Sequence, residues 1–348
     1  MRKVGLFLGA LTLLVCASSC KKENVTPEGD GFKVPVYTEG VYHPTMKIAT
    51  VSEGGVVTQE WNWVGDNLDK IQEVAGGATT YNYSGNYISK VSITGDQTEE
   101  LRYYYDENNK FSKCEIYYDG APAVTMNFAH NAAGKLGSAN VIIEDNFLLT
   151  LASGLLGGGS LFEKVVGRPV AESMIMMARM QHAKNPKFSV GNKEFGVTFE
   201  WNGENLSKQI LNGNASVVLD TNDLAMIQQF VDIPEDYLSM IQLAMAFGGG
   251  LPITLTFNDT ISSTFDNNYN PMFCNWGTLI SPETMSLNNV LTMSTKGAVS
   301  VSASLLGQTM NLYNTPIEDY AEYQYQCNDK KYPIQVTGSK DVVYTYKQ

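Results

Sequence analysis

The sequence predicts a mainly β protein: an antiparallel meander of hairpin repeats that forms a curved or barrel-like sheet, with helical insertions covering one face. Three observations lead to this fold class. A short aromatic-rich segment recurs along the chain, and internal repeats of this kind define an architecture. Large and polar residues alternate within each copy, which is the period of a half-buried strand. Glycine, asparagine and aspartate follow each alternating run, as expected for tight turns.

The first 20 residues resemble the leader of a bacterial lipoprotein. A basic start is followed by an apolar run over residues 4–15 and by small residues directly before Cys20, the three-part pattern of an export signal. In such leaders the cysteine becomes the acylated first residue of the mature chain. We therefore expect a signal peptide at residues 1–19 and lipid attachment at Cys20, through fatty-acyl chains such as palmitate that anchor the protein in a membrane. Cys16 does not fit, because Val15 precedes it; the alternative is a secreted protein in which Cys20 is coincidental.

Residues 20–32 are predicted to be a flexible tether, and residues 33–348 a single β-rich domain. The tether begins with the charged stretch Lys21-Lys22-Glu23-Asn24. This stretch partly matches the signal that directs Bacteroidetes-type lipoproteins to the cell surface. The expected location is the outer membrane, lipid-anchored and facing the cell exterior.

The composition excludes one class of partner. Loss of Arg2 and Lys3 with the leader leaves 22 of the 24 basic side chains against 36 acidic ones, a net charge of about −14. Nucleic-acid binding by phosphate neutralisation is therefore excluded as a function. Beyond the leader only Cys114, Cys274 and Cys327 remain, without metal-ligand spacing, and we expect them to be core thiols.

The repeat unit is clearest at residues 61–71 and 81–91, which align without a gap, and at residues 199–208. Looser copies occupy residues 103–113, 126–136, 255–262 and 323–334. The aromatic anchors Trp63, Tyr83 and Tyr105 are spaced by about twenty residues, the length of one hairpin plus its connection.

Each unit is interpreted as a hairpin whose aromatic residues share one face. Trp61 and Trp63 would lie beside Tyr81 and Tyr83 in aromatic cross-strand pairs, with the intervening asparagines on a wet outer face. Tyr104 would point outward, as would one of Tyr117 and Tyr118. The second half of the unit is irregular, since Leu68 and Ile71 have opposite parity. A β-bulge or a twisted return strand explains how both reach the core.

Two insertions near residues 147–184 and 222–248 are predicted to be helical. Apolar residues recur at helical spacing after Pro169, up to about His182. In the second insertion, Asn222 can cap residues 223–230, and Pro234 opens residues 235–247. The leucine-rich residues 147–162 are too short and too interrupted by glycine for a membrane span.

No residue set stands out for catalysis or for a cofactor. His43, His130 and His182 are too few and too dispersed for a histidine-rich metal site or a Ser/His/Asp triad. Residues 157–160 lack the Gly-Lys-Ser/Thr of a phosphate loop. The acidic turns at residues 106–109 and 266–268 lack the EF-hand pattern and are interpreted as hairpin tips. We predict no metal, no cofactor and no catalytic residue.

The chain resembles uncharacterised Bacteroidetes-type lipoproteins with a porin-like fold. The matching features are Tyr42-His43-Pro44, the following Lys47-Ile48 and the hairpins described above. The units are also similar to tyrosine-aspartate repeats, as at Tyr105-Asp106. The resemblance implies a curved or barrel-like meander and no particular activity.

Three functional hypotheses remain. The first is a non-enzymatic cell-surface binding module for a glycan, a peptide or an outer-membrane protein, with Tyr104 and Trp276 as candidate contacts, although Trp276 also suits a core. The second is an extracellular polysaccharide hydrolase with two carboxyl groups roughly 5 to 10 Å apart in a cleft. The third is an outer-membrane barrel with its aromatic face in lipid. Asp259-Thr260-Ile261 resembles a short O-glycan acceptor site, with a strand-end turn as the alternative.

Overall fold

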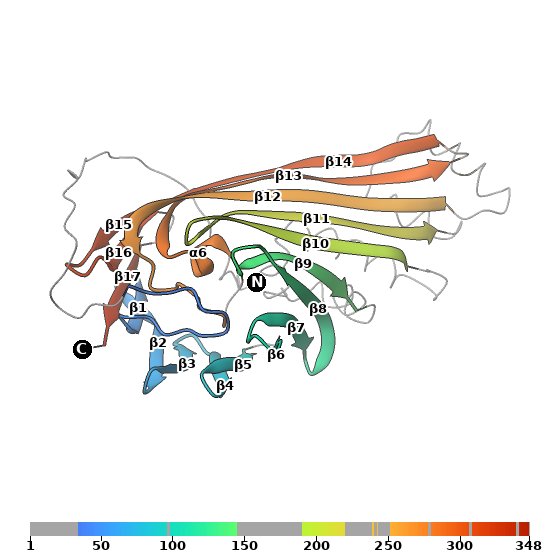
Figure 1. The fold of residues 1–348 in the computed structure, drawn as a ribbon. Helices are drawn as coiled ribbons and strands as arrows, with labels where there is room; N and C mark the ends of the chain where they lie inside the picture. The colour runs from blue at the N-terminus through green and yellow to red at the C-terminus, as the bar shows by residue number, and fades with distance from the viewer. Residues whose placement is uncertain are drawn as a thin grey trace.

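The computed structural model describes residues 34–95, 98–144, 190–219, 251–277, 280–305, 308–338 and 341–347, together with Ser239 and Gln242. The described residues form one sheet of 17 strands (Figure 1). The strands of the first half are β1 (Ile48–Glu53), β2 (Val56–Val64), β3 (Asn67–Glu73), β4 (Ala78–Ser84), β5 (Tyr87–Thr94), β6 (Thr98–Tyr105), β7 (Phe111–Tyr118), β8 (Ala121–His130) and β9 (Leu136–Ile143). Those of the second half are β10 (Val190–Asn202), β11 (Asn205–Leu219), β12 (Leu251–Tyr269), β13 (Asn288–Leu305), β14 (Gln308–Glu322), β15 (Gln324–Cys327), β16 (Pro333–Thr337) and β17 (Val342–Tyr346).

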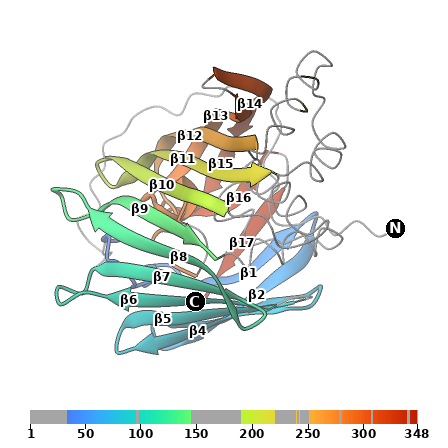
Figure 2. The ribbon, with the colours of Figure 1, turned by 90° about the vertical axis from the view of Figure 1, so that its right-hand side faces the viewer.

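The sheet is an antiparallel meander that nearly closes on itself. Neighbours in sequence pair from β1 through to β14, and β15, β16 and β17 continue the series until β17 pairs with β1. Only Tyr323 separates β14 from β15. The two strands therefore follow one another along the wall, β14 pairing with β13 and β15 pairing with β16. As a result β4 to β7 lie opposite β11 to β14, and β8 to β10 connect the two sides (Figure 2). The predicted barrel-like antiparallel meander is confirmed.

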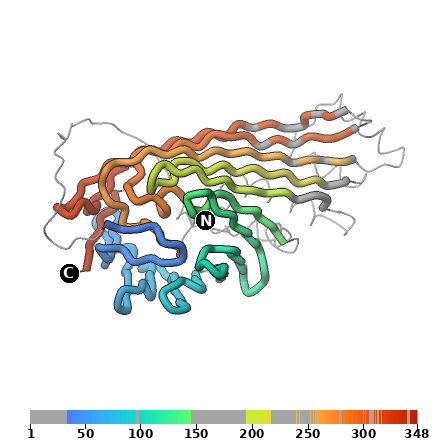
Figure 3. Tube along the Cα trace, in the orientation of Figure 1, coloured from blue at the N-terminus to red at the C-terminus, as the bar shows by residue number. Residues whose placement is uncertain are grey.

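The barrel wall has unequal height. Strands β10 to β14 are 13 to 19 residues long, whereas β1 to β9 have 6 to 10 residues. The five long strands therefore extend side by side well beyond the rest of the barrel (Figure 3).

One β-bulge is repeated in six hairpins and explains the irregular half of the repeat unit. In β2–β3, Asn62 pairs with Lys70 and Trp63 with Leu68, so that Asp69 is skipped. This shift allows both Leu68 and Ile71 to be buried despite their opposite parity. The skipped residues of the six hairpins are Asp69, Ser89, Ser112, Gly137, Ser207 and Ile334.

The aromatic residues face the interior, but they do not pair with one another across strands as predicted. Trp61 lies opposite Ile71, and Tyr81 opposite Val91, because an aliphatic return strand separates each pair of aromatic strands. Tyr104 and Tyr117 point outward, and Tyr118 packs against the core. The expected copy at residues 255–262 is also wrong as a hairpin, since this segment lies within the single strand β12.

One end of the barrel is filled by a plug, which we define as residues 34–47 together with the described residues 270–277 and 280–287. The second segment contains the short helix α6 (Pro282–Met285), and Tyr42, Trp276 and Met285 are fully buried. The Trp276 indole donates a hydrogen bond to the Thr38 carbonyl at 3.2 Å, and Tyr42 donates one to the Pro271 carbonyl at 2.7 Å. The core of the molecule therefore sits where the plug meets the barrel wall.

The predicted helical insertion near residues 147–184 lies outside the described residues. So does the one near residues 222–248, apart from Ser239 and Gln242, which are both helical. Cys114 and Cys274 are buried free thiols, as expected, and Cys327 is a half-buried free thiol.

Candidate functional site

The plug is held by backbone groups that the repeated bulges leave available. Ile88, Phe111, Leu136 and Leu206 occupy the same position in four hairpins. Their N–H groups donate to the Gly40 carbonyl at 2.7 Å, to Glu39 Oε2 at 2.8 Å, to the Tyr37 hydroxyl and to Ser286 Oγ at 3.0 Å. In the sixth hairpin the equivalent residue is Pro333, which has no N–H to satisfy. The bulges thus prepare a ring of donors for the plug.

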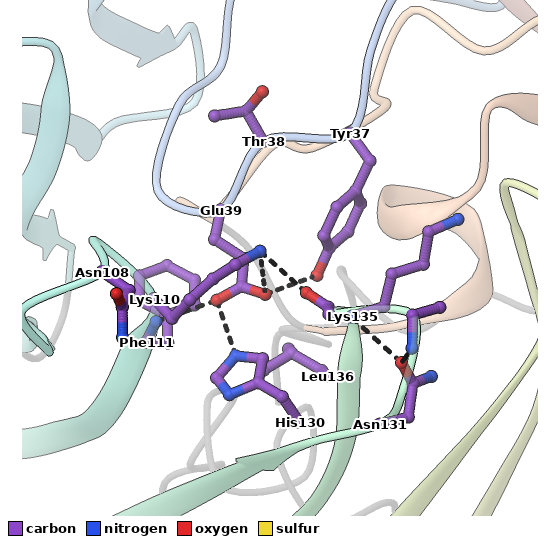
Figure 4. A network of polar contacts seen from close by, with 12 residues as sticks. Tyr37, Thr38, Glu39, Asn108, Lys110, Phe111, His130, Asn131, Lys135 and Leu136 are labelled. Carbon is purple, nitrogen blue, oxygen red and sulfur yellow. Dashed lines mark hydrogen bonds and ion pairs between the residues drawn. The ribbon is translucent and has the colours of Figure 1, made fainter.

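Glu39 is the charged centre of this contact (Figure 4). Its carboxylate is 2% exposed and accepts hydrogen bonds from Phe111 N, from Tyr37 at 3.3 Å and from His130 Nε2 at 2.9 Å. The Lys110 ammonium lies 3.6 Å away. His130 stands where other hairpins carry Trp63, Tyr83, Tyr105 or Trp201. Because its oxygens are taken by protein donors, Glu39 fixes the plug and is not a ligand site.

The inner wall beyond the plug is acidic. The residues that face inward there with carboxyl side chains are Glu53, Glu73, Glu99, Asp259, Glu283 and Asp319. Glu283 on α6 accepts a hydrogen bond from the Tyr323 hydroxyl at 2.9 Å. Its surface is solvent-accessible, yet desolvation by the surrounding protein raises its pKa.

Three side chains with inward parity on the long strands β10 to β14, which form the tall wall, carry oxygen atoms without a hydrogen-bond partner among the described residues: Asp259, Ser263 and Gln209. Asp259 on β12 and Gln209 on β11 are 3% and 4% exposed, and Asp259 Oδ1 and Gln209 Oε1 accept no hydrogen bond from the part of the chain that the structure describes. Burial raises the pKa of Asp259 to about 6, opposed by a hydrogen bond from the Thr260 backbone. Buried acceptors without donors are rare because each costs the desolvation energy of the group.

The outer face of β5, β6 and β7 carries a cluster of charged and aromatic side chains, which we call the outer cluster. Its members are Lys90, Glu100, Arg102, Tyr104, Lys113, Glu115 and Tyr117. Glu115 accepts hydrogen bonds from Lys113 at 2.7 Å and from the Tyr104 hydroxyl at 2.6 Å, and these bonds lower its pKa. Arg102 lies 4.0 Å from the centre of the Tyr117 ring. Tyr104 is 37% exposed.

The structure disperses the other candidates. Cys20 and His182 lie outside the described residues, and His43 contacts Asn67 at 2.9 Å. Trp276 is 0% exposed, so its role as a surface contact is wrong: it packs edge-on against Phe111 at 4.7 Å. Within the described ranges, no three His, Cys, Asp or Glu side chains form a group that could hold a metal ion.

The predicted hairpin tip at residues 106–109 is confirmed, since these residues join β6 to β7, but the one at residues 266–268 is wrong, because they lie within β12 where its register shifts. Asp106 Oδ1 accepts hydrogen bonds from the backbone N–H groups of Asn108 and Lys110, as the side chain of a turn residue often does. Asp266 is satisfied by the backbone and side chains of Asn268 and Asn289. The expectation of a strand-end turn at residues 259–261 is wrong, because Asp259 and Thr260 lie in the middle of β12.

Inward or outward placement was readable from alternation, but the partnerless oxygens of Asp259 and Gln209 were not. Their parity within β12 and β11 matches that of Phe257 and Leu211, which are buried. A polar residue in phase with apolar neighbours is the only sequence signal for them.

No helix within the described residues has the length and apolar character needed to cross a membrane.

Comparisons with known proteins assign no family. No protein-family model matches the chain, and no curated protein matches it. Among solved structures, the chain is similar to a porin-like protein from Bacteroides uniformis ATCC 8492, with 12% identity, a TM-score of 0.21 and coverage of 84% of this chain and 86% of that one. It is also similar to TcdB2-TccC3-TEV, with 9% identity, a TM-score of 0.18 and coverage of 84% of this chain and 14% of that one. The fold described above rests on the chain's own strand order and contacts.

Proposed function

We propose that this protein is a cell-surface lipoprotein that acts as a non-enzymatic binding module. The leader and Cys20 support attachment to the outer membrane through lipid, and the partial export signal after Cys20 supports an outward orientation. The barrel is the folded body that this anchor holds. The ligand class that its surface favours is a glycan, with a protein of the cell envelope as the alternative.

The observation that carries the proposal is the outer cluster. Two tyrosine rings, two carboxylates and three cations lie on one exposed face, and ion pairs and ring contacts already hold them in place. Aromatic rings that stack on apolar sugar faces, beside charged groups that bond hydroxyls, form a typical recognition surface. Pre-ordered side chains lose little entropy on binding.

The same face opposes the outer-membrane barrel hypothesis. A membrane barrel turns apolar side chains toward lipid, and a charged substitution near the midplane costs about 2 to 4 kcal/mol. Here β2 to β7 present Glu60, Lys70, Lys90, Arg102 and Glu115 on the outside, while their apolar residues fill the interior. A wall of this kind is suited to water, and the protein would then need its lipid anchor to remain at the membrane.

Two experiments test the proposal. In the native host, wild-type protein should incorporate a clickable palmitate analogue and be protease-accessible on intact cells, whereas Cys20→Ala should not be labelled. If the wild-type protein does not incorporate the palmitate analogue, the proposal of a lipid anchor is wrong.

The mature chain carrying Cys20→Ser should be a soluble monodisperse species that binds on a glycan array. Tyr104→Ala and Arg102→Ala should weaken that binding by tenfold or more, and Glu200→Ala, an exposed outward residue of β10, should leave it unchanged. A blank array with capture of an envelope protein through Tyr104 favours the protein partner. Blank results in both assays contradict the binding module.

The hydrolase hypothesis gains no support from the described residues. The inward carboxylates are distributed over six elements, and Asp259, the most deeply buried carboxyl among β12 to β14, has a glycine and a leucine as its direct cross-strand neighbours. We therefore place binding ahead of catalysis.

A further inference from the structure

We propose that the inner wall at Asp259 and Gln209 binds a small monovalent cation, either an alkali metal ion or a small ammonium ion. This site is inside the barrel and is independent of the outer cluster and of the proposed surface function. Two buried oxygens, Asp259 Oδ1 and Gln209 Oε1, face it and have no donor among the described residues.

The backbone register places the two side chains together. Asp259 lies opposite Leu211, and Gln209 opposite Ile261, so that they are diagonal neighbours on adjacent strands, with Cα atoms roughly 7 to 8 Å apart in such a pair. Both residues share the inward face with Phe257 and Leu211. Side chains of this length can converge on one ion between them.

Gly297 on β13 provides the space. It lies directly opposite Asp259, and a Cβ atom there would lie 2.2 Å from the Asn258 carbonyl oxygen, 2.8 Å from Asp259 Cα and 3.0 Å from Asp259 Oδ1. The carboxylate therefore extends over a bare backbone position. Any side chain at Gly297 would push the carboxylate aside.

The chemistry of the surrounding groups selects the charge of the ion. Around Asp259 the described inward residues of the neighbouring strands are Val197 and Phe199 on β10, Leu211 on β11, Thr295 and Gly297 on β13, and Ile317 and Asp319 on β14. None is a cation, and Asp319 adds negative charge.

A carboxylate and an amide carbonyl offer only acceptor oxygens, which suit a hard cation or N–H donors. Asp259 is the buried carboxylate of the site, and one positive charge neutralises it, whereas a divalent ion would leave an uncompensated buried charge, since Asp319 is exposed.

The test measures unfolding temperature in the mature chain carrying Cys20→Ser. Sodium, potassium, ammonium and methylammonium chlorides are compared with choline chloride, which is too bulky for the site, at equal ionic strength and pH 7.5. We expect at least one small cation to raise the melting temperature by about 2 °C or more relative to choline. The four salts distinguish an alkali ion from an ammonium ion.

Variants separate this site from general salt effects. Asp259→Asn should abolish the preference, Gln209→Met should reduce it, and Glu318→Gln, an exposed residue of β14, should retain it in full. If Asp259→Asn does not fold, Gln209→Met alone decides.

Crystals soaked in thallium(I) should show an anomalous peak between Asp259 and Gln209. Equal melting temperatures in all salts, a preference that survives in both site variants, or a larger effect of calcium chloride would each overturn the proposal.

Discussion

Gly40 shows how closely the plug fits the wall at the scale of single residues. Its φ is +71°, and a Cβ atom there would lie 2.1 Å from the Tyr105 hydroxyl oxygen. That hydroxyl is itself engaged with the Ile88 carbonyl, so the ring cannot retreat without losing a hydrogen bond.

We predict that Gly40→Ala destabilises the protein by about 1 to 3 kcal/mol more than Gly85→Ala does. Gly85 has a similar φ of +61° but no atom within 4 Å of its Cβ position, so it controls for the backbone conformation. Urea unfolding measures the loss of stability in both variants. Equal losses would mean that the contact with Tyr105 is not tight.

We predict that Asp259, also a single residue, makes the stability of the fold depend on pH in an unusual direction. Burial raises its pKa from 3.8 to about 6, so the folded state holds its proton more tightly than the unfolded state does. The stability contributed by protonation is fully present below pH 3.8 and is lost as the pH rises through about 6, by at most about 3 kcal/mol.

The free energy of unfolding of wild type relative to Asp259→Asn should therefore fall between pH 4 and pH 7. Urea titrations in choline buffers, without small cations, measure this difference. A pH-independent difference between the two proteins would show that the Asp259 carboxyl is not desolvated.

At the scale of elements, neighbouring hairpins are joined through their aromatic anchors as well as through strand pairing. The Trp63 indole donates to the Ile48 carbonyl at 2.8 Å, the Tyr83 hydroxyl to the Leu68 carbonyl at 2.7 Å, and the Trp201 indole to the Leu136 carbonyl at 2.7 Å. Leu68 and Leu136 are the residues that precede the skipped bulge position in their hairpins. The repeat therefore encodes both a bulge and the group that caps it.

Tyr83→Phe should cost about 0.5 to 1.5 kcal/mol, because the buried Leu68 carbonyl loses its side-chain donor. Tyr104→Phe removes a hydroxyl whose partner, Glu115, keeps Lys113 and water, and its effect should stay within about 0.5 kcal/mol. Chemical denaturation of the two variants gives the comparison. A larger loss for Tyr104→Phe would contradict the role of the anchor.

Hairpins were accessible to sequence reasoning because they are local. Alternation in residues 61–63 and the glycine at position 65 determine a strand and a turn over a few residues. The bulge was also inferable, since Leu68 and Ile71 could not otherwise both be buried. The pairing of each aromatic strand with aliphatic return strands was not predicted, because alternation within one strand indicates which face a side chain occupies and not which residue lies opposite it.

At the scale of the whole molecule, the plug converts a sheet into a filled barrel. The Trp276 indole contacts Phe111 and Thr38, and Tyr103 donates to the Trp276 carbonyl, so that this residue joins β6, β7 and both plug segments. The wall and the plug share one hydrophobic core. We infer that the barrel end and the plug unfold together.

Trp276→Ala should destabilise the protein by about 3 to 5 kcal/mol, through the cavity it leaves at this junction. Tyr104→Ala, which removes an exposed ring from the outer face, should cost far less. Both are measured by urea unfolding followed by far-UV circular dichroism. A small effect of Trp276→Ala would show that the plug is dispensable for the fold.

The sequence by itself determined the hairpins and the inward and outward faces, because each depends on a short-range pattern of side-chain size and polarity. Tertiary structure alone decided that the meander nearly closes, that Trp276 is core and not surface, and that Asp259 lies buried beside Gln209. These features depend on contacts such as that between Trp276 and Thr38, 238 residues apart. No local periodicity carries the position of a partner so distant in the chain, since it is set by how all the hairpins curve together.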